Sequence, residues 1–139
     1  MHLLDTDTVT LLFESHPRVL HRLRELPDEE VATSAVTRAE ILRGRIDFLL
    51  KAANGSQLRK AHNLLVQTEA FLARMIVVPL DDNACGHFDR IRAVKALRKV
   101  GRADLLIASV ALAQEAVLVT RNVRHCKLVA NLKIANWAD

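Results

Sequence analysis

The hydrophobic positions of the chain form two kinds of pattern. Short apolar runs alternate with longer segments in which apolar residues recur at helical spacing. Short apolar runs predict buried strands, and helical spacing predicts helices with one buried face. Their alternation indicates an α/β fold with a mainly parallel sheet. The predicted strands are His2–Leu4, Val31–Thr33, Met75–Val78 and Ala116–Val119, with Lys133–Ala135 as an edge strand.

The segments between these strands predict helices. Ser34 is a suitable N-cap because its hydroxyl can accept a hydrogen bond from the first helical turn. The predicted helices are Thr8–Glu14, Pro17–Glu25, the segment from Ser34 toward Lys51, Gln57–Arg74, the segment from Asp81 or Asp82 to near Val100, and Arg102–Glu115. No repeat or Pro/Gly/Ser-rich linker divides the chain, so residues 1–139 are predicted to form one domain.

Composition and charge narrow the range of functions. No apolar run approaches the roughly 20 residues of a membrane-spanning helix, and the opening segment does not resemble a signal peptide, so we expect a cytoplasmic protein without a membrane partner. The formal charge of +4 is compatible with a polyanionic partner, although it also suits an ordinary solvated surface. Aromatic residues make up only 4% of the chain, which argues against an RNA-binding sheet that stacks bases on its rings.

Three acidic residues occupy positions suited to chemistry. Asp5 directly follows a predicted strand, where sites form in parallel sheets. Glu40 lies about two turns into the next helix, and Asp104 opens a helix that is apolar almost all round. Each also has a structural interpretation: Asp5 as a helix cap, Glu40 as an ion-pair partner of Arg38 or Arg43, and Asp104 as a charge that complements the helix dipole.

Considered together, the three acids favour a metal site. Carboxylates that share one site repel each other unless a cation neutralises them. Oxygen ligands suit Mg²⁺, with Mn²⁺ as a substitute. Such an ion can activate water and stabilise charge on a phosphate. We therefore predict that Asp5 and Asp104 are the main metal ligands and that Glu40 orients water or completes the coordination shell, in a site that cleaves phosphodiesters.

A phosphatase is an alternative interpretation of the first acid. The segment Asp5–Thr8 after an apolar strand also fits haloacid-dehalogenase-like phosphatases. In that case Asp5 would be phosphorylated, Asp7 would act as acid and base, and Ser34 would bind phosphate. That chemistry also needs a later Lys and a pair of acids, whereas Asp104 is a single acid followed by an apolar helix. The phosphatase interpretation is therefore disfavoured.

Four segments in order carry a resemblance to a known family. They are Leu3–Asp7 (LLDTD), Ala32–Ile41 (ATSAVTRAEI), Ala103–Ala108 (ADLLIA) and Val119–Arg124 (VTRNVR), followed by Lys133–Trp137 (KIANW). Together they resemble the PIN-domain nucleases and, within them, the VapC-type toxins of bacterial toxin–antitoxin pairs. The resemblance covers essentially the whole chain.

The resemblance implies a three-layer α/β fold, with four to five mainly parallel strands flanked by helices. It implies that Asp5, Glu40 and Asp104 meet at the carboxyl edge of the sheet. It also implies Mg²⁺-dependent endoribonuclease activity, a cognate antitoxin that covers the site, and a homodimer that binds RNA.

One residue departs from the family pattern. Many PIN nucleases have a fourth acid just after the Thr of the last core strand, and here that position holds Asn122. An amide oxygen could ligate a metal or orient water, but it brings no charge, so a single ion is expected. Asp7 could compensate, and Thr6 and Thr120 are further candidates at the same site. An inactive PIN-like domain that only binds RNA or protein is the remaining alternative.

A basic segment near the end of the fifth predicted helix is the candidate for contacts with the RNA backbone. Basic side chains supply affinity for phosphates that is independent of sequence. An exposed solvated face is an equally good interpretation. The candidate residues are Arg90, Arg92, Lys95, Arg98 and Lys99.

Overall fold

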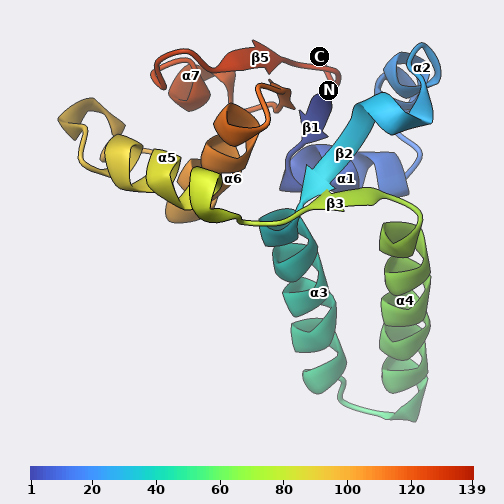
Figure 1. The fold of residues 1–139 in the computed structure, drawn as a ribbon. Coiled ribbons are helices and arrows are strands. Elements are labelled where there is room, and N and C mark those ends of the chain that lie inside the picture. The colour runs from blue at the N-terminus through green and yellow to red at the C-terminus, as the bar shows by residue number, and fades with distance from the viewer.

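The computed structural model describes residues 1–139 and contains one five-stranded sheet in the order β3-β2-β1-β4-β5 (Figure 1). All four strand pairs are parallel. The strands are β1 (His2–Leu4), β2 (Val31–Ser34), β3 (Ile76–Val78), β4 (Val117–Val119) and β5 (Lys133–Ala135). All five predicted strands and the α/β fold class are confirmed.

Helices connect the strands, as the parallel arrangement requires. They are α1 (Thr6–Phe13), α2 (Pro17–Arg24), α3 (Ala35–Leu50), α4 (Gly55–Ala73), α5 (Asp82–Arg92), α6 (Arg102–Ala113) and the short α7 (Val123–Cys126), with 3₁₀ turns at Asp28–Glu30 and Lys95–Leu97. Ser34 caps α3 as predicted, because its hydroxyl accepts a hydrogen bond from the Thr37 backbone N–H at 3.0 Å. No helix is both long and apolar enough to cross a membrane.

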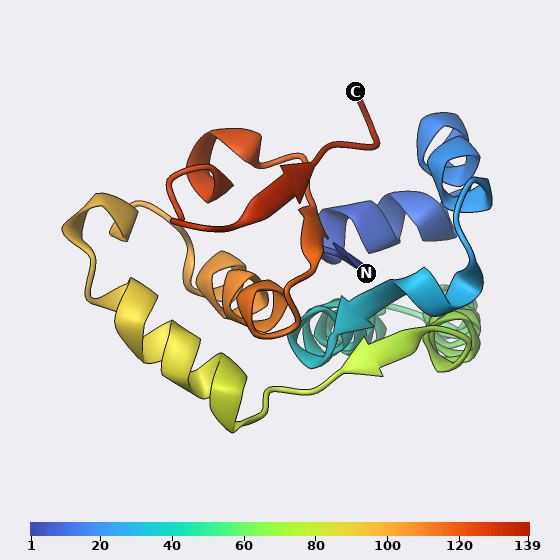
Figure 2. The same ribbon diagram turned by 45° about the horizontal axis from the view of Figure 1, so that its top comes forward.

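The sheet lies between two helical layers, and neighbouring residues of one strand face different layers. Leu3 packs in a core that α5 and α6 complete, with Ile107 from α6. Leu4 packs in a second core with Val9 of α1 and Leu72 of α4. This alternation follows from the strand geometry, which points successive side chains to opposite faces. Figure 2 shows α6 on one side of the sheet and α1 on the other, which confirms the three-layer arrangement.

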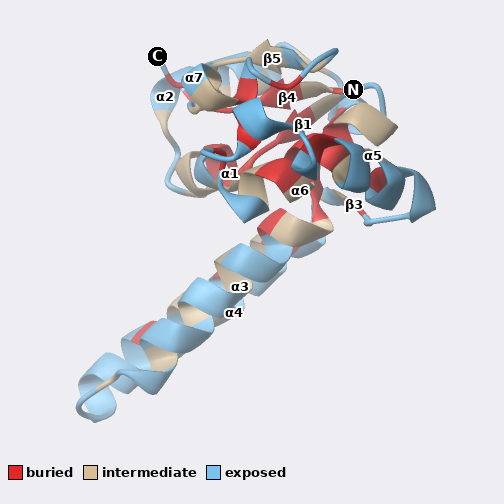
Figure 3. Cartoon of the chain, turned by 90° about the vertical axis from the view of Figure 1, so that its left-hand side faces the viewer, coloured by how far each residue is buried: buried red, intermediate tan, exposed pale blue.

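Helices α3 and α4 form an arm that projects from the body of the molecule (Figures 1 and 3). The two helices pack against each other along the arm, and much of their surface is exposed (Figure 3). Several large apolar side chains of the arm are exposed to solvent. They are Ile46, Phe48, Leu50, Leu58 and Val66, of which Leu50 is 77% exposed.

The helix predicted to run to near Val100 is shorter in the structure, and this corrects the sequence analysis. Helix α5 ends at Arg92, and Val94 has an extended backbone. Ile91, Leu97 and Val100 are all buried in one cluster against α6. In a continuous helix of 3.6 residues per turn, Leu97 and Val100 would point about 240° and about 180° away from Ile91. The chain must therefore leave the helix to bury all three.

Two smaller features of the helices also differ from the predictions. Helix α1 begins at Thr6 with Asp5 as its N-cap, two residues before the predicted start at Thr8. Asp7 lies exposed in the first turn. The short helix α7 was not predicted, because four residues are too few to show helical periodicity.

Candidate active site at the carboxyl edge of the sheet

Buried polar residues gather where β1, β2 and β4 end. Eight polar or charged residues are buried in the chain, and only Thr68 and Ser109 lie elsewhere. The six at this edge are Asp5, Thr8, Thr33, Ser34, Thr37 and Thr120. A buried polar side chain costs free energy unless it is hydrogen-bonded, so such a concentration marks the edge as a candidate site. The position agrees with the general location of sites in parallel sheets.

Asp5 lies at the centre of this edge. Its backbone N–H donates to the carbonyl of Val119 in β4 at 3.0 Å, and its Oδ1 accepts from the Thr8 backbone N–H at 2.9 Å. The residue is only 6% exposed. Burial raises the pKa of the Asp5 carboxyl group, and the side chains of Thr120 and Thr8 partly oppose that shift. Asp5 is therefore both the cap of α1 and a carboxylate whose charge lacks solvation.

Glu40 reaches the same edge from α3. Its Oε1 accepts a hydrogen bond from the Thr6 hydroxyl at 2.6 Å. The hydroxyl of Thr37, one turn earlier in α3, lies 3.2 Å from the same Thr6 oxygen. Glu40 is otherwise exposed. The structure thus places Glu40 beside the residue that follows Asp5, and the expected alternative of an ion pair with a neighbouring Arg is wrong.

Asp104 and Asn122 meet across the end of β4. The Asn122 side chain donates from Nδ2 to Oδ2 of Asp104 at 2.9 Å. Its Oδ1 lies 3.0 Å from Nδ1 of His125. The Asn122 backbone N–H donates to the hydroxyl of Thr120 at 3.0 Å. Asp104 itself is half-buried in the first turn of α6. The hydrogen bonds of Asn122 therefore connect α6 with the segment after β4.

No cationic side chain balances the three carboxylates. The ion pairs of the chain join His21 and Arg22 to Glu25, and Arg121 to Asp139, so none of them includes Asp5, Glu40 or Asp104. No three His, Cys, Asp or Glu side chains are close enough to form a ready metal-binding cluster. Mg²⁺ commonly uses one or two carboxylates and keeps several waters. A buried, unpaired Asp5, linked to Asp104 through the hydrogen bonds of Thr120 and Asn122, fits an ion held in that way.

Only some of the other candidate site residues predicted from the sequence lie in this network. Thr6 and Thr120 belong to the network, whereas Asp7 makes no side-chain hydrogen bond to it and acts only through its charge, which helps to raise the pKa of Asp5. The basic residues do not share one helix, because Arg90 and Arg92 end α5 and the other three follow it. All five of them are exposed: Arg90, Arg92, Lys95, Arg98 and Lys99.

Sequence reasoning missed Thr37 and His125. Thr37 is fully buried and joins Ser34 to Thr6 through hydroxyl contacts of 3.3 and 3.2 Å. His125 is one of six histidines that are scattered along the sequence without metal-ligand spacing. Its position three residues after Asn122 was the available signal, since residues at that spacing are neighbours in a helix. The largest cavity, about 770 Å³, lies away from this network between α5, α6 and the segment before β5.

Comparison with known proteins identifies the family. Residues 3–131 match the family described as PIN domain. The chain is 28% identical to Ribonuclease VapC2 of Rickettsia felis, over 99% of this chain and 98% of that protein. It is 27% identical to the tRNA(fMet)-specific endonuclease VapC of Salmonella typhimurium, over 97% and 96%.

A solved structure agrees with these relatives. The DNA-bound VapBC complex of Salmonella typhimurium contains a chain that aligns with a TM-score of 0.76 and 26% identity, covering 98% of this chain and 97% of that one. Both the fold and the sequence therefore point to the family that the four segments resemble. These relatives are VapC-type nucleases, and the chain itself belongs to the PIN-domain family.

Proposed function

We propose that this protein is an endoribonuclease that requires a divalent cation, Mg²⁺ or Mn²⁺, and that it is the toxin of a toxin–antitoxin pair in the cytoplasm. The observation that carries the proposal is the buried carboxylate of Asp5. It is 6% exposed, its pKa is raised by burial, and no ion pair neutralises it. A buried charge of this kind is costly unless a cation compensates it. Hydrogen bonds link Glu40 to Thr6, the residue after Asp5, and link Asp5 to Asp104 through Thr120 and Asn122.

The proposed roles follow from the contacts of each side chain. Asp5 and Asp104 would hold the ion, and Glu40, oriented by Thr6, would position a water molecule. When bound, the cation would lower the pKa of a water and stabilise negative charge on the attacked phosphate. No side chain is needed as a covalent nucleophile, which distinguishes this chemistry from the phosphatase alternative. The exposed location of Asp7 also removes support for its proposed role as the acid of a phosphatase.

RNA is the proposed substrate. Both relatives described above are named as nucleases, one a ribonuclease and the other specific for tRNA(fMet). We infer that tRNA is the first class of RNA to test. The exposed basic residues between Arg90 and Lys99 would contact RNA phosphates and supply affinity for RNA that does not depend on the base sequence.

A protein partner is proposed for the exposed arm. The solved structures that resemble this chain include toxin–antitoxin complexes. The exposed apolar side chains of α3 and α4, such as Phe48 and Leu50, give this chain a surface that a protein could cover. We infer that a cognate antitoxin binds the chain and blocks the edge of the sheet, and that two copies of the chain form a dimer.

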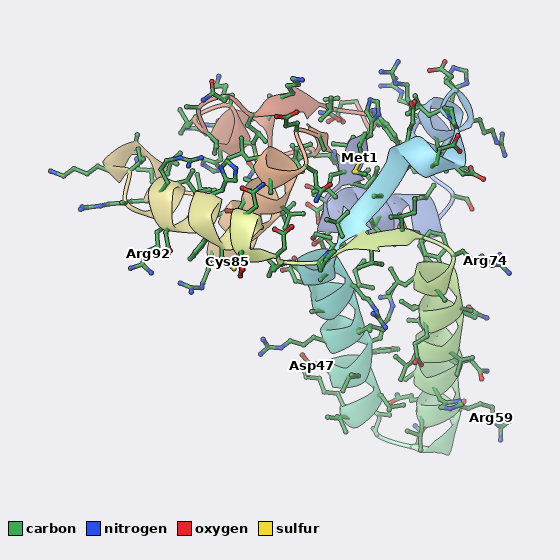
Figure 4. The ribbon with its side chains drawn as sticks, viewed as in Figure 1. Met1, Asp47, Arg59, Arg74, Cys85 and Arg92 are labelled. Carbon is green, nitrogen blue, oxygen red and sulfur yellow. The ribbon has the colours of Figure 1, made fainter.

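The test compares RNA cleavage by purified, antitoxin-free protein in Mg²⁺ with cleavage in EDTA. Asp5→Asn, which keeps the size of the side chain, should abolish cleavage. Asp47→Asn is the matched control, because Asp47 is exposed on the arm in α3 (Figure 4). Cleavage that survives chelation or Asp5→Asn would contradict the proposal. RNA binding without any cleavage by the wild-type protein would favour the inactive PIN-like alternative.

A further inference from the structure

The side chain of Asn122 does not make the contact usual for its position. Asn122 is the N-cap residue of α7, where an Asn side chain ordinarily accepts a hydrogen bond from the first helical turn. Here the side chain makes no capping bond. Its two polar ends instead contact Asp104 at 2.9 Å and His125 at 3.0 Å. The amide therefore bridges α6 and α7.

The chemistry of the three groups fixes the direction of this bridge. An ionised carboxylate can only accept hydrogen bonds, so the NH₂ end of Asn122 must face Asp104. The amide oxygen then faces His125, and Nδ1 of the imidazole must carry the hydrogen that it accepts. A reversed amide would place its oxygen against the carboxylate and its NH₂ against an N–H. Asp104 therefore determines which end of Asn122 faces it, and His125, with its hydrogen on Nδ1, holds the opposite end of the amide.

The backbone around Asn122 is held in place independently of its side chain. The Asn122 N–H donates to Thr120 Oγ1 at 3.0 Å, and the Asn122 carbonyl accepts from the Cys126 N–H at 3.1 Å. Cys126 is buried in the core against the sheet. With the backbone fixed at both ends, the remaining freedom of Asn122 is rotation of its side chain. His125, half-buried one turn later, restricts that rotation.

We propose that His125 is a positioning residue that holds the Asn122 amide so that its NH₂ group fixes Asp104. The inference rests on the proposed function, in which Asp104 holds the cation. One carboxylate oxygen of Asp104, Oδ2, is engaged by Asn122, which leaves Oδ1 for the ion. Both ends of the Asn122 amide make hydrogen bonds, to Asp104 and to His125, as suits a residue that supports a ligand. From the sequence, the amide oxygen of Asn122 was expected to ligate a metal or orient water.

The first test measures the tautomer of His125 in the metal-free protein. Long-range ¹H–¹⁵N spectra at mildly alkaline pH should show neutral His125 with its hydrogen on Nδ1. In Asn122→Ala the Nε2–H form should become dominant, because the acceptor is gone. The peaks are assigned by their loss in His125→Phe, and exposed His62 on α4 should not change in Asn122→Ala. An Nε2–H tautomer in the wild-type protein would overturn the inference.

The second test measures Mn²⁺ affinity from the free Mn²⁺ signal in electron paramagnetic resonance. His125→Phe and Asn122→Ala should each weaken binding by about tenfold or more, the usual effect of removing a residue that orients a metal ligand. Because both act on Asp104 through one path, the double variant should be no weaker than Asn122→Ala. His125→Asn, whose NH₂ can replace Nδ1–H, should retain most of the affinity. His62→Phe is the matched control.

The outcomes separate the inference from the proposed function. If the wild-type protein binds Mn²⁺ and His125→Phe binds it equally well, or if the two substitutions weaken binding additively, the positioning role is wrong and the nuclease proposal stands. If the wild-type protein binds no Mn²⁺ and cleaves no RNA, the proposed function fails, and the role of His125 fails with it. Circular dichroism of each variant confirms that it is folded.

Discussion

The hydroxyl of Thr6 donates a hydrogen bond to Oε1 of Glu40 across 2.6 Å, and this contact joins the first turn of α1 to α3. Asp5, the N-cap of α1, directly precedes Thr6. The turn that holds the buried carboxylate of Asp5 therefore also orients Glu40. Asp5, which follows β1, and Glu40, which follows β2, are thus coupled through Thr6.

This coupling predicts that Thr6→Val lowers the rate of RNA cleavage by about tenfold, as for other residues that orient groups at a metal site. Thr6→Ser keeps the hydroxyl and should retain most of the activity. The free energy of unfolding should fall by only about 1 kcal/mol or less in Thr6→Val, since the bond is exposed to solvent. Cleavage rates and urea unfolding of both variants test the prediction. Equal rates for Val and Ser would show that the contact does not serve catalysis.

The raised pKa of Asp5 predicts that Asp5→Asn stabilises the metal-free protein at neutral pH. Between the pKa of the unfolded chain, about 3.9, and the higher pKa of the folded protein, the folded state binds more protons. The free energy of unfolding of the wild type therefore falls as pH rises through that interval. Asn has no charge to desolvate, so Asp5→Asn should be more stable than the wild type at neutral pH. This difference in the free energy of unfolding should vanish below about pH 4, where Asp5 of the wild type is protonated in both the folded and the unfolded state.

Urea unfolding of wild type and Asp5→Asn across this pH range measures the effect. Asp5→Ala is the informative second variant, because it removes the charge and also the cap of α1, and loss of a cap costs about 1 kcal/mol. Mg²⁺ should raise the melting temperature of the wild type and not that of Asp5→Asn, since only a ligand of the folded state stabilises it. A stabilisation of Asp5→Asn that persists unchanged at low pH would contradict the desolvation argument.

The basic segment predicts a specific salt dependence of RNA binding. Changing Arg92, Lys95 and Lys99 together to Gln should reduce the slope of log affinity against log salt concentration by about 2, if each side chain neutralises one phosphate of a single strand. Fluorescence anisotropy with the catalytically inactive Asp5→Asn protein makes the measurement without cleavage.

A triple variant of equal charge provides the control. Lys51, Arg59 and Lys60 are exposed near the tip of the arm, and Arg59 and Arg92 extend from different elements and point away from each other (Figure 4). Their change to Gln should leave the slope nearly unaltered. Equal reductions in both triple variants would show that net charge, and not the basic segment, determines RNA affinity.

Two isoleucines with different burial provide a test of the packing. Ile107→Ala on α6 should lower the free energy of unfolding by about 2–5 kcal/mol, because Ile107 is 1% exposed in the core against the sheet. Ile46→Ala on the arm should change it by about 0.5 kcal/mol or less, because Ile46 is 44% exposed. Guanidinium unfolding of both variants makes the comparison. A large loss in Ile46→Ala would mean that the arm is packed against another copy of the chain.

The sequence by itself determined the order and type of the main elements. Short apolar strands such as His2–Leu4 and the apolar helix that follows Asp104 are local patterns, and the spacing of the elements allows only a parallel sheet with helical crossovers. The positions of Asp5 and Asp104 at the ends of these elements could also be predicted, because a residue next to a buried apolar segment lies where that segment meets the edge of the core.

Only the tertiary structure decided how the polar side chains are connected. Glu40 turns to Thr6 instead of a neighbouring Arg, and the side chain of Asn122 reaches Asp104 in α6. The end of α5 at Arg92 was likewise decided by the burial of Leu97 and Val100 against α6. Each of these outcomes depends on distances between segments that are remote in the chain. Hydrophobic periodicity predicts which face of a helix or strand is buried. It does not predict which polar side chains come within hydrogen-bond distance once these faces have packed.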